Sequence, residues 1–337
     1  MARTFEDKPA TRERTPLLVG LIGPSGTGKT YSALRLATGI QRVSGGDIHV
    51  IDSEARRALH YANDFKFRHV AFGAPFSPLD YLAAIEHCVK KGAGTIIIDS
   101  MSHEHEGPGG LLEMHEAETA RMSGGDWKKA ERVKMLAWQK PKAQRRRLIN
   151  TMLQLPCNFI LCFRAKHKLK LVKGEEPTQL GYMPIAGEEF VYEMVLKCLL
   201  LPGADGVPVL NSEFEGERAM IKIPSQFRGM FDPRQPRQLS EEMGTALASW
   251  AAGTEAPADV SAADLIKSYE ACSDAATYRQ LEESRKRVWG KATRDEKAAL
   301  KKAADDAKEA IEASSAVHEA DEHGEVPFSD DGAAGEG

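Results

Sequence analysis

The sequence of 337 residues has no long apolar run and little cysteine. No stretch approaches the roughly 20 apolar residues that a membrane-spanning helix needs, so we expect no membrane partner. The five cysteines are odd in number and have no spacing typical of a zinc site, and Cys157, Cys162 and Cys198 lie in or beside apolar runs. They predict buried free thiols in a reducing compartment, not a disulfide framework.

The first 16 residues are polar and charged, which is unlike a signal peptide. We therefore expect a cytoplasmic protein. The formal net charge of −4 neither favours nor excludes a nucleic-acid partner, so the distribution of charge along the chain is more informative than its sum.

Residues 23–30 match the phosphate-loop pattern G-x-x-x-x-G-K-[ST], between an apolar run at 17–22 and a helix-period segment at 31–37. Glycines allow the backbone amides to wrap around phosphates, and the helix N-terminus adds partial positive charge. Lys29 is expected to reach the β- and γ-phosphates, and Thr30 to coordinate Mg²⁺. With ATP and Mg²⁺ as the expected cofactors, the predicted nucleotide-binding residues are Gly23, Pro24, Ser25, Gly26, Thr27, Gly28, Lys29, Thr30 and Tyr31.

Two later apolar runs end in carboxylates. Residues 47–52 lead into Ser53-Glu54, and residues 95–99 end at Asp99. Such runs are typical of strands buried on both faces of a parallel sheet, whose carboxyl ends meet at the ligand-binding edge. Asp99 fits the acid associated with Mg²⁺, and Glu54 fits a general base that activates water. Lys29, Glu54 and Asp99 are the predicted catalytic residues.

The order of these motifs resembles the RecA core. After the phosphate loop come Val-Ile-Asp-Ser-Glu-Ala-Arg-Arg-Ala-Leu at 50–59 and Ile-Ile-Ile-Asp-Ser at 96–100. In RecA-like proteins an Asp-x-Glu after the second strand supplies the catalytic base, which the resemblance assigns to Glu54. The resemblance covers about residues 15–225 and is most similar to the compact RecA-like ATPases of bacteriophages that act in recombination and single-strand annealing.

This resemblance implies an α/β fold with a RecA-like P-loop NTPase core, in which helices flank a mostly parallel sheet. It also implies DNA-stimulated ATP hydrolysis, assembly into a homo-oligomeric ring or filament, and, for a phage protein, residence in the bacterial host cytoplasm. The loops that follow the Asp99 strand and the next strand face the DNA channel in that family.

Two basic segments fall in or just after those positions. One spans Lys128 to Arg147 with a single acid, and the other spans Arg164 to Lys170 after an apolar strand at 159–163. Contacts with phosphates would give salt-sensitive binding to single-stranded DNA. Trp127 and Trp138 offer rings for base stacking, although core positions are favoured for both. The candidate DNA contacts are Arg145, Arg146, Arg147, Lys166, Lys168 and Lys170.

Arg164 matches the position at which the family has a polar sensor of the γ-phosphate. Arg164 is expected to stabilise the γ-phosphate in cis, or else Arg164 or Lys166 serves as an arginine-finger-like group to a neighbouring subunit. The segment His103-Glu104-His105-Glu106 does not predict a metal site, because histidines at i and i+2 do not share a helix face.

Beyond the core, the pattern predicts late strands at 195–201 and 220–223 and a helix at 240–251 with Ser240 as its N-cap. Three helices are expected at 261–272, 274–288 and 293–313, with no residues that suggest chemistry. The acidic end carries Pro327-Phe328, similar to the tip of bacterial single-strand-binding proteins, which suggests recruitment of replication or recombination proteins; the alternative is a tail that only solubilises the chain. The expected organisation is a flexible N-terminus at 1–15, a core at 16–252, a linker at 253–260, a helical module at 261–315 and a disordered acidic tail at 316–337.

Three classes of function remain open from the sequence. The first is a DNA-dependent RecA-like ATPase in recombination, annealing or repair. The second is the ATPase subunit of another DNA machine, such as a helicase loader or a packaging motor. A small-molecule kinase is weaker, because it needs neither the basic segments nor the helical module.

Overall fold

The computed structural model describes residues 7, 14–170, 176–253, 262–272, 275–290 and 292–322. The chain divides into two compact units, Met1–Ala256 and Pro257–Gly337. Most of the expected flexible N-terminus, nearly all of the expected linker and the end of the acidic tail lie outside the described residues. Each unit is described by itself.

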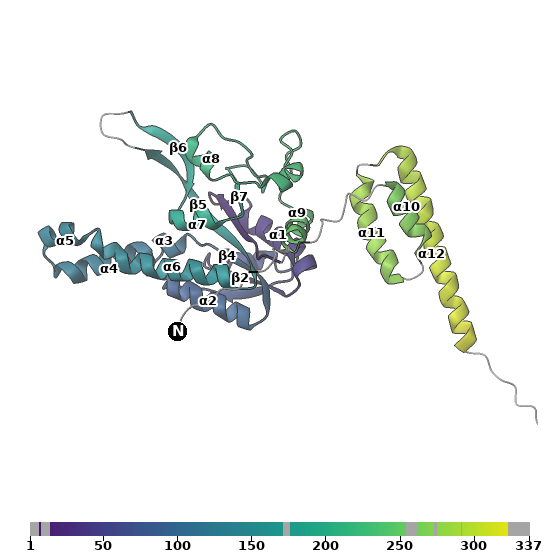
Figure 1. Ribbon diagram of the computed structural model, residues 1–337, viewed down its shortest axis with the longest axis horizontal. Helices are drawn as coiled ribbons and strands as arrows, with labels where there is room; N and C mark the ends of the chain where they lie inside the picture. The colour runs from purple at the N-terminus through teal and green to yellow at the C-terminus, as the bar shows by residue number, and fades with distance from the viewer. Residues whose placement is uncertain are drawn as a thin grey trace, which may run out of the picture. The chain divides into compact units, whose positions relative to one another are not determined.

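The first unit is built on a mostly parallel seven-stranded sheet in the order β3-β2-β4-β5-β1-β7, with β6 paired to β5 (Figure 1). Helices flank this sheet, which confirms the α/β class expected from the sequence. The strands are β1 (Leu18–Gly23), β2 (Asp47–Asp52), β3 (Arg68–Ala71), β4 (Ala93–Asp99), β5 (Asn158–Lys170), β6 (Thr178–Pro184) and β7 (Leu196–Leu199).

The central strands are buried on both faces, as their continuous apolar runs predict. In β4, Ile96 and Ile98 pack into one core cluster and Ile97 into the other. The first cluster includes side chains of α2 (Pro78–Lys90) and α6 (Gln139–Gln154). The second includes side chains of α1 (Lys29–Ser44) and α9 (Glu241–Ala251). Two apolar layers therefore hold the strand ends in place.

The late elements follow the sequence pattern in part. The Ser240 hydroxyl accepts a hydrogen bond from the Met243 amide and caps α9, as predicted. The strand expected at 195–201 is present as β7, but the one expected at 220–223 is reduced to a bridge between Lys197 and Lys222. The other short elements are η1 (Arg57–Tyr61), α7 (Glu188–Glu193), α8 (Glu215–Ala219) and η3 (Ser225–Met230).

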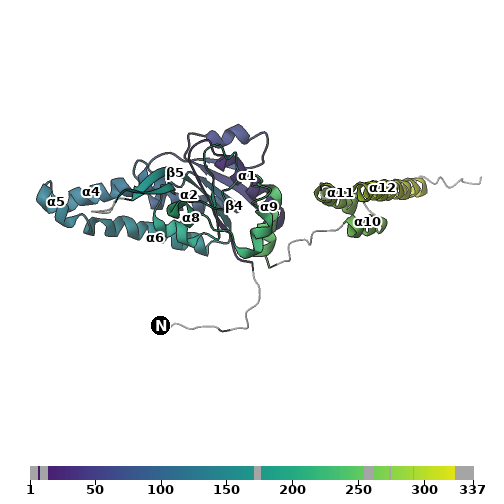
Figure 2. The same cartoon turned by 90° about the horizontal axis from the view of Figure 1, so that it is seen from above.

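A helical arm follows β4. It consists of α3 (His103–Glu106), α4 (Leu111–Ser123), α5 (Trp127–Val133), η2 (Leu136–Trp138) and α6. In both views α4 runs beside α6, and α5 lies at the end farthest from the sheet (Figures 1 and 2). Most of the first basic segment lies on α5 and α6.

The second basic segment is a strand and not the expected loop. β5 continues beyond the parallel sheet and pairs with the antiparallel β6, with Lys166 opposite Met183 and Lys168 opposite Gly181. The physical reason is that this antiparallel partner satisfies the backbone hydrogen bonds of the extension. The hairpin and the arm extend beyond the same side of the sheet (Figures 1 and 2).

The second unit contains α10 (Ala262–Glu270), α11 (Ala275–Trp289) and α12 (Arg294–Glu322) among its described residues. Leu265, Tyr269, Leu300 and Ala304 are buried in a core of its own. α12 runs to Glu322, past the expected end of the helical module at 315. Ala and Glu dominate there and favour continuation of the helix. Pro327-Phe328 lies outside the described residues.

No helix of the described part of the chain is long and apolar enough to cross a membrane. All five cysteines are buried, and none of them forms a disulfide in the described structure. The expectation of buried thiols is confirmed.

Candidate functional site

The register of the parallel strands brings the carboxyl ends of the strands that carry the predicted motifs to one edge of the sheet. Asp52 of β2 lies opposite Asp99 of β4, and Asp99 lies opposite Cys162 of β5. On the other side of β5, Gly23 of β1 lies opposite Arg164. Segments far apart in the sequence therefore deliver their side chains to the carboxyl ends of four neighbouring strands, where open α/β sheets bind ligands.

The predicted phosphate loop is the tight connection between β1 and α1. Gly28 has a φ of 86° and stands just before α1, and a Cβ atom there would lie 2.8 Å from the Gly206 amide nitrogen. Only glycine satisfies both the backbone angle and the close approach. Lys29 is the first residue of α1, and its Nζ donates to the carbonyls of Gly23 at 2.8 Å and Pro24 at 2.6 Å. The ammonium group is thus held over the loop.

Thr30 and Asp99 meet beside this loop. The Thr30 hydroxyl donates to Asp99 Oδ2 at 2.5 Å. Burial raises the pKa of Asp99, and the hydrogen bond from Thr30 opposes that shift. A hydroxyl and a carboxylate this close are hard oxygen ligands of the kind that Mg²⁺ prefers. The donor set therefore fits the predicted magnesium site.

Glu54 is engaged by Arg164. Nε of Arg164 donates to Glu54 Oε1 at 2.6 Å, and Nη2 donates to Oε2 at 2.5 Å. Burial raises the pKa of Glu54, but Arg164, His103 and Arg57 outweigh it, so the net pKa lies below its usual value. The predicted base and the predicted sensor are therefore direct partners, which the sequence did not anticipate.

The turn that carries Glu54 is held by Asp52. Its Oδ1 accepts the Glu54 amide at 2.8 Å, and its Oδ2 accepts the Ala58 amide at 3.0 Å and lies 3.1 Å from His69 Nε2. Ala55 and Arg56, directly after Glu54, have positive φ values of 56° and 65°. Such backbone is unfavourable for residues with a Cβ and is held by the surrounding contacts. Asp52 is therefore a structural anchor of the turn.

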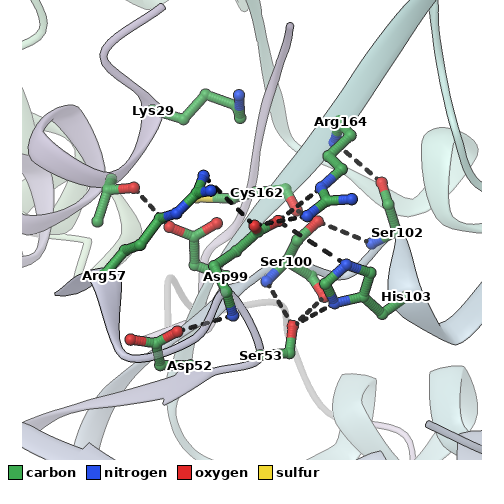
Figure 3. Close-up of polar contacts among 12 residues, drawn as sticks. Lys29, Asp52, Ser53, Arg57, Asp99, Ser100, Ser102, His103, Cys162 and Arg164 are labelled. Atoms are coloured by element: carbon green, nitrogen blue, oxygen red, sulfur yellow. Dashed lines mark hydrogen bonds and ion pairs between the residues drawn. The ribbon is translucent and has the colours of Figure 1, made fainter. Parts of the chain in front are cut away.

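His103 and Ser53 complete the polar network (Figure 3). His103 Nδ1 lies 2.8 Å from Ser53 Oγ, and His103 Nε2 lies 3.9 Å from Glu54 Oε1. The sequence analysis weighed His103 only for metal binding, which it did not predict. Its relation to Glu54 has no local sequence signal, because it depends on β2 and β4 being neighbours.

An aromatic cluster lies next to the phosphate loop. The Tyr31 ring is 5.7 Å from the Tyr61 ring and 5.4 Å from the Phe65 ring, centroid to centroid. Tyr31 remains 39% exposed. Of these three, only Tyr31 was predicted as part of the site, because the other two come from the segment after the Glu54 turn.

The candidate DNA contacts divide into exposed and buried residues. Arg146 and Arg147 are exposed on α6, Lys166 and Lys170 are exposed on β5, and Lys168 is half-buried. Lys166 also forms an ion pair of 3.5 Å with Glu106.

Arg145 is 2% exposed, and its Nε and Nη2 donate to the two carboxylate oxygens of Glu104 at 3.0 and 2.8 Å. The prediction that Arg145 contacts DNA is wrong, because its guanidinium group is buried in an ion pair that joins α6 to α3.

The two tryptophans of the arm differ. Trp138 stacks on His115, with ring centroids 4.0 Å apart, as expected of a packed position. Trp127 is 72% exposed at the start of α5, so the favoured core position is wrong for this residue.

No protein-family model matches the chain, and no curated protein matches it in sequence.

Proposed function

We propose that the protein is a RecA-like P-loop ATPase that binds and hydrolyses ATP and acts on single-stranded DNA in phage-type recombination, annealing or repair. The observation that carries the proposal is the meeting of Lys29, Thr30, Asp99 and Glu54 at one sheet edge. A mostly parallel sheet, with β5 between β1 and β4, agrees with a RecA-like core.

Lys29 and the loop amides would bind the phosphates. Burial lowers the pKa of Lys29, while the nearby acids Asp99 and Glu54 favour its charged form. The ammonium group already has two carbonyl partners, Gly23 and Pro24, and would exchange them for phosphate oxygens. This places a positive charge where negative charge develops during phosphoryl transfer.

Thr30 and Asp99 would hold Mg²⁺ through their oxygens. When bound, the ion neutralises charge on the phosphates and orients them for in-line attack. Asp99 is 5% exposed, and a cation beside it would favour its ionised form.

Glu54 would take a proton from the attacking water, a role that is worth about 10²–10⁴ in rate. Arg164 donates to both of its carboxylate oxygens and lowers its basicity, so opening of this pair would make Glu54 a stronger base. The released guanidinium would then be available to the γ-phosphate, either in its own subunit or in a neighbouring one of a homo-oligomer.

Exposed cations on the arm and the hairpin support the proposed DNA interaction. Arg146, Arg147 and Lys170 leave their charges in solvent. Such groups bind the phosphate backbone without sequence preference, and binding weakens as salt rises. Trp127, exposed at the end of the arm, adds a ring suited to base stacking.

A second candidate is the ATPase subunit of another DNA machine, a helicase loader or packaging motor. The observation that favours it is the second unit, whose helices have their own core. This arrangement suits a docking module for a protein partner.

Steady-state ATP hydrolysis with and without an unstructured single-stranded oligonucleotide tests the proposal. We expect Mg²⁺-dependent turnover that the oligonucleotide stimulates. Turnover without stimulation and without DNA binding at low salt would favour the loader or motor. No turnover under any condition contradicts both.

A further inference from the structure

We propose that His103 is a positioning residue for Glu54, which orients the carboxylate to accept a proton from water. The inference rests on the proposed ATPase function and deepens it. It assigns a role to a side chain that no motif identifies.

Three cationic or polar side chains surround the Glu54 carboxylate among the described residues: Arg164, Arg57 and His103. Arg164 binds both oxygens, and a carboxylate held in this way by a guanidinium group is a weak base. The base becomes stronger when this pair opens. A second group must then fix its orientation, because a freely rotating carboxylate loses the advantage of a placed base.

His103 is better suited to this task than Arg57. The Arg57 side chain is 62% exposed and lies 3.7 Å from Glu54, so it fixes the carboxylate weakly. The His103 side chain is only 13% exposed. Its ring packs against Phe76, with centroids 5.0 Å apart, and bonds to Ser53. A ring fixed on two sides orients a neighbour at little entropic cost.

The hydrogen-bond pattern assigns the tautomer of His103. Ser53 Oγ accepts the Ser100 amide at 2.9 Å, and its single proton is shared between the Ser100 carbonyl at 3.1 Å and His103 Nδ1 at 2.8 Å. We assign that proton to Nδ1, because the Ser100 carbonyl already accepts a hydrogen bond from the Tyr81 hydroxyl at 2.7 Å; the Nε2 proton of a neutral ring then faces Glu54. Burial and Arg164 lower the pKa of His103, which favours this neutral form.

The distance from His103 Nε2 to Glu54 Oε1 is 3.9 Å, which is longer than a hydrogen bond. A shift of about 1 Å closes it, and catalytic hydrogen bonds often tighten only in the reacting complex. The arrangement resembles that of catalytic triads, in which one group orients the base and a third group orients the second. Here His103 would orient Glu54, and Ser53 would orient His103.

The helix that carries His103 also reaches both basic elements. Glu104 is buried in its ion pair with Arg145 of α6, and Glu106 pairs with Lys166 of β5. The short helix α3 therefore connects the arm and the hairpin to the Glu54 site.

Two substitutions separate the two nitrogen atoms of His103. His103→Gln retains an amide that reaches toward the Nε2 position, and His103→Asn retains one near Nδ1. We expect His103→Asn to lower kcat for ATP about 10- to 100-fold with KM nearly unchanged, as for loss of an orienting partner. His103→Gln should recover most of kcat. Equal losses in both variants, or a change mainly in KM, would overturn the inference.

The control is His87→Asn on the exposed face of α2, which should leave kcat unchanged. Thermal melting of each variant distinguishes misfolding from loss of positioning. In a Glu54→Gln background, His103→Asn should have no further effect on kcat, because His103 acts through Glu54. If His103→Asn lowers kcat further in the Glu54→Gln background, the inference is overturned even if Glu54 is the base.

If the Glu54→Gln variant hydrolyses ATP at the wild-type rate, the assignment of Glu54 as the base is contradicted, and the inference falls with it. A slow Glu54→Gln variant beside a fully active His103→Asn variant overturns the inference alone. The two failures are therefore distinguishable.

Discussion

The Thr30 hydroxyl donates a 2.5 Å hydrogen bond to Asp99, although 69 positions separate the two residues. Thr30 lies in the first turn of α1, and Asp99 ends β4. The parallel register of the sheet brings the two elements together. Two oxygen atoms of the kind that bind a hard cation therefore lie in direct contact.

Asp99→Asn should raise the Mg²⁺ concentration needed for half-maximal ATP hydrolysis by about tenfold or more, because a neutral amide is a weaker ligand for a hard cation. A magnesium titration of the hydrolysis rate measures this. Asp64→Asn, at an exposed position outside the site, is the matched control. An unchanged titration curve would remove Asp99 from the magnesium site.

Glu54→Gln should retain nucleotide binding and slow hydrolysis by about 10²–10⁴, the range for loss of a general base. The Asp52 carboxylate is occupied by the turn and does not replace it. Fluorescent nucleotide binding and single-turnover hydrolysis separate the two steps. Wild-type hydrolysis by this variant would show that another group activates the water.

Charge reversal on the candidate DNA contacts should weaken single-stranded DNA binding. Arg146→Glu with Arg147→Glu, or Lys168→Glu with Lys170→Glu, removes phosphate partners and should flatten the dependence of affinity on salt. Fluorescence anisotropy with several oligonucleotide sequences across a salt series measures both effects. Lys301→Glu with Lys302→Glu, on exposed positions of α12, is the control of equal charge change. A loss of affinity that depends on the oligonucleotide sequence would contradict binding to the phosphate backbone.

Arg145→Ala should destabilise the first unit by about 3–5 kcal/mol, because it leaves Glu104 charged and buried without its partner. The neighbouring exposed Arg146→Ala should change stability by less than about 0.5 kcal/mol. Chemical denaturation of both variants gives the comparison. Equal free energies of unfolding for the two variants would contradict the burial of the ion pair between Arg145 and Glu104.

The phosphate loop and the two strand-end acids were predictable because each is a local motif, and the carboxyl ends of parallel strands meet at one edge. Arg145 was misassigned because its charge drew attention within a basic run. Its spacing from Pro141, Leu148 and Met152 follows the helical period and places it on the buried face of α6. That signal was available in the sequence.

The hairpin also had a signal. Lys166, Lys168 and Lys170 alternate along the chain, which is the period of a strand, but their charges suggested a loop. The contacts of Glu54 with Arg164 and His103 had no signal, because they join the turn after β2, the helix α3 and the strand β5, which are distant in sequence. Such contacts emerge only when the sheet order is known.

The most direct test of the account is ATP hydrolysis by the wild type and by Lys29→Ala, with Mg²⁺, in the presence and absence of single-stranded DNA. The account predicts DNA-stimulated turnover by the wild type and a loss of about 10²-fold or more in a folded Lys29→Ala variant, because the phosphates lose their charged partner. Equal rates for the two proteins would contradict the nucleotide site on which every other assignment depends.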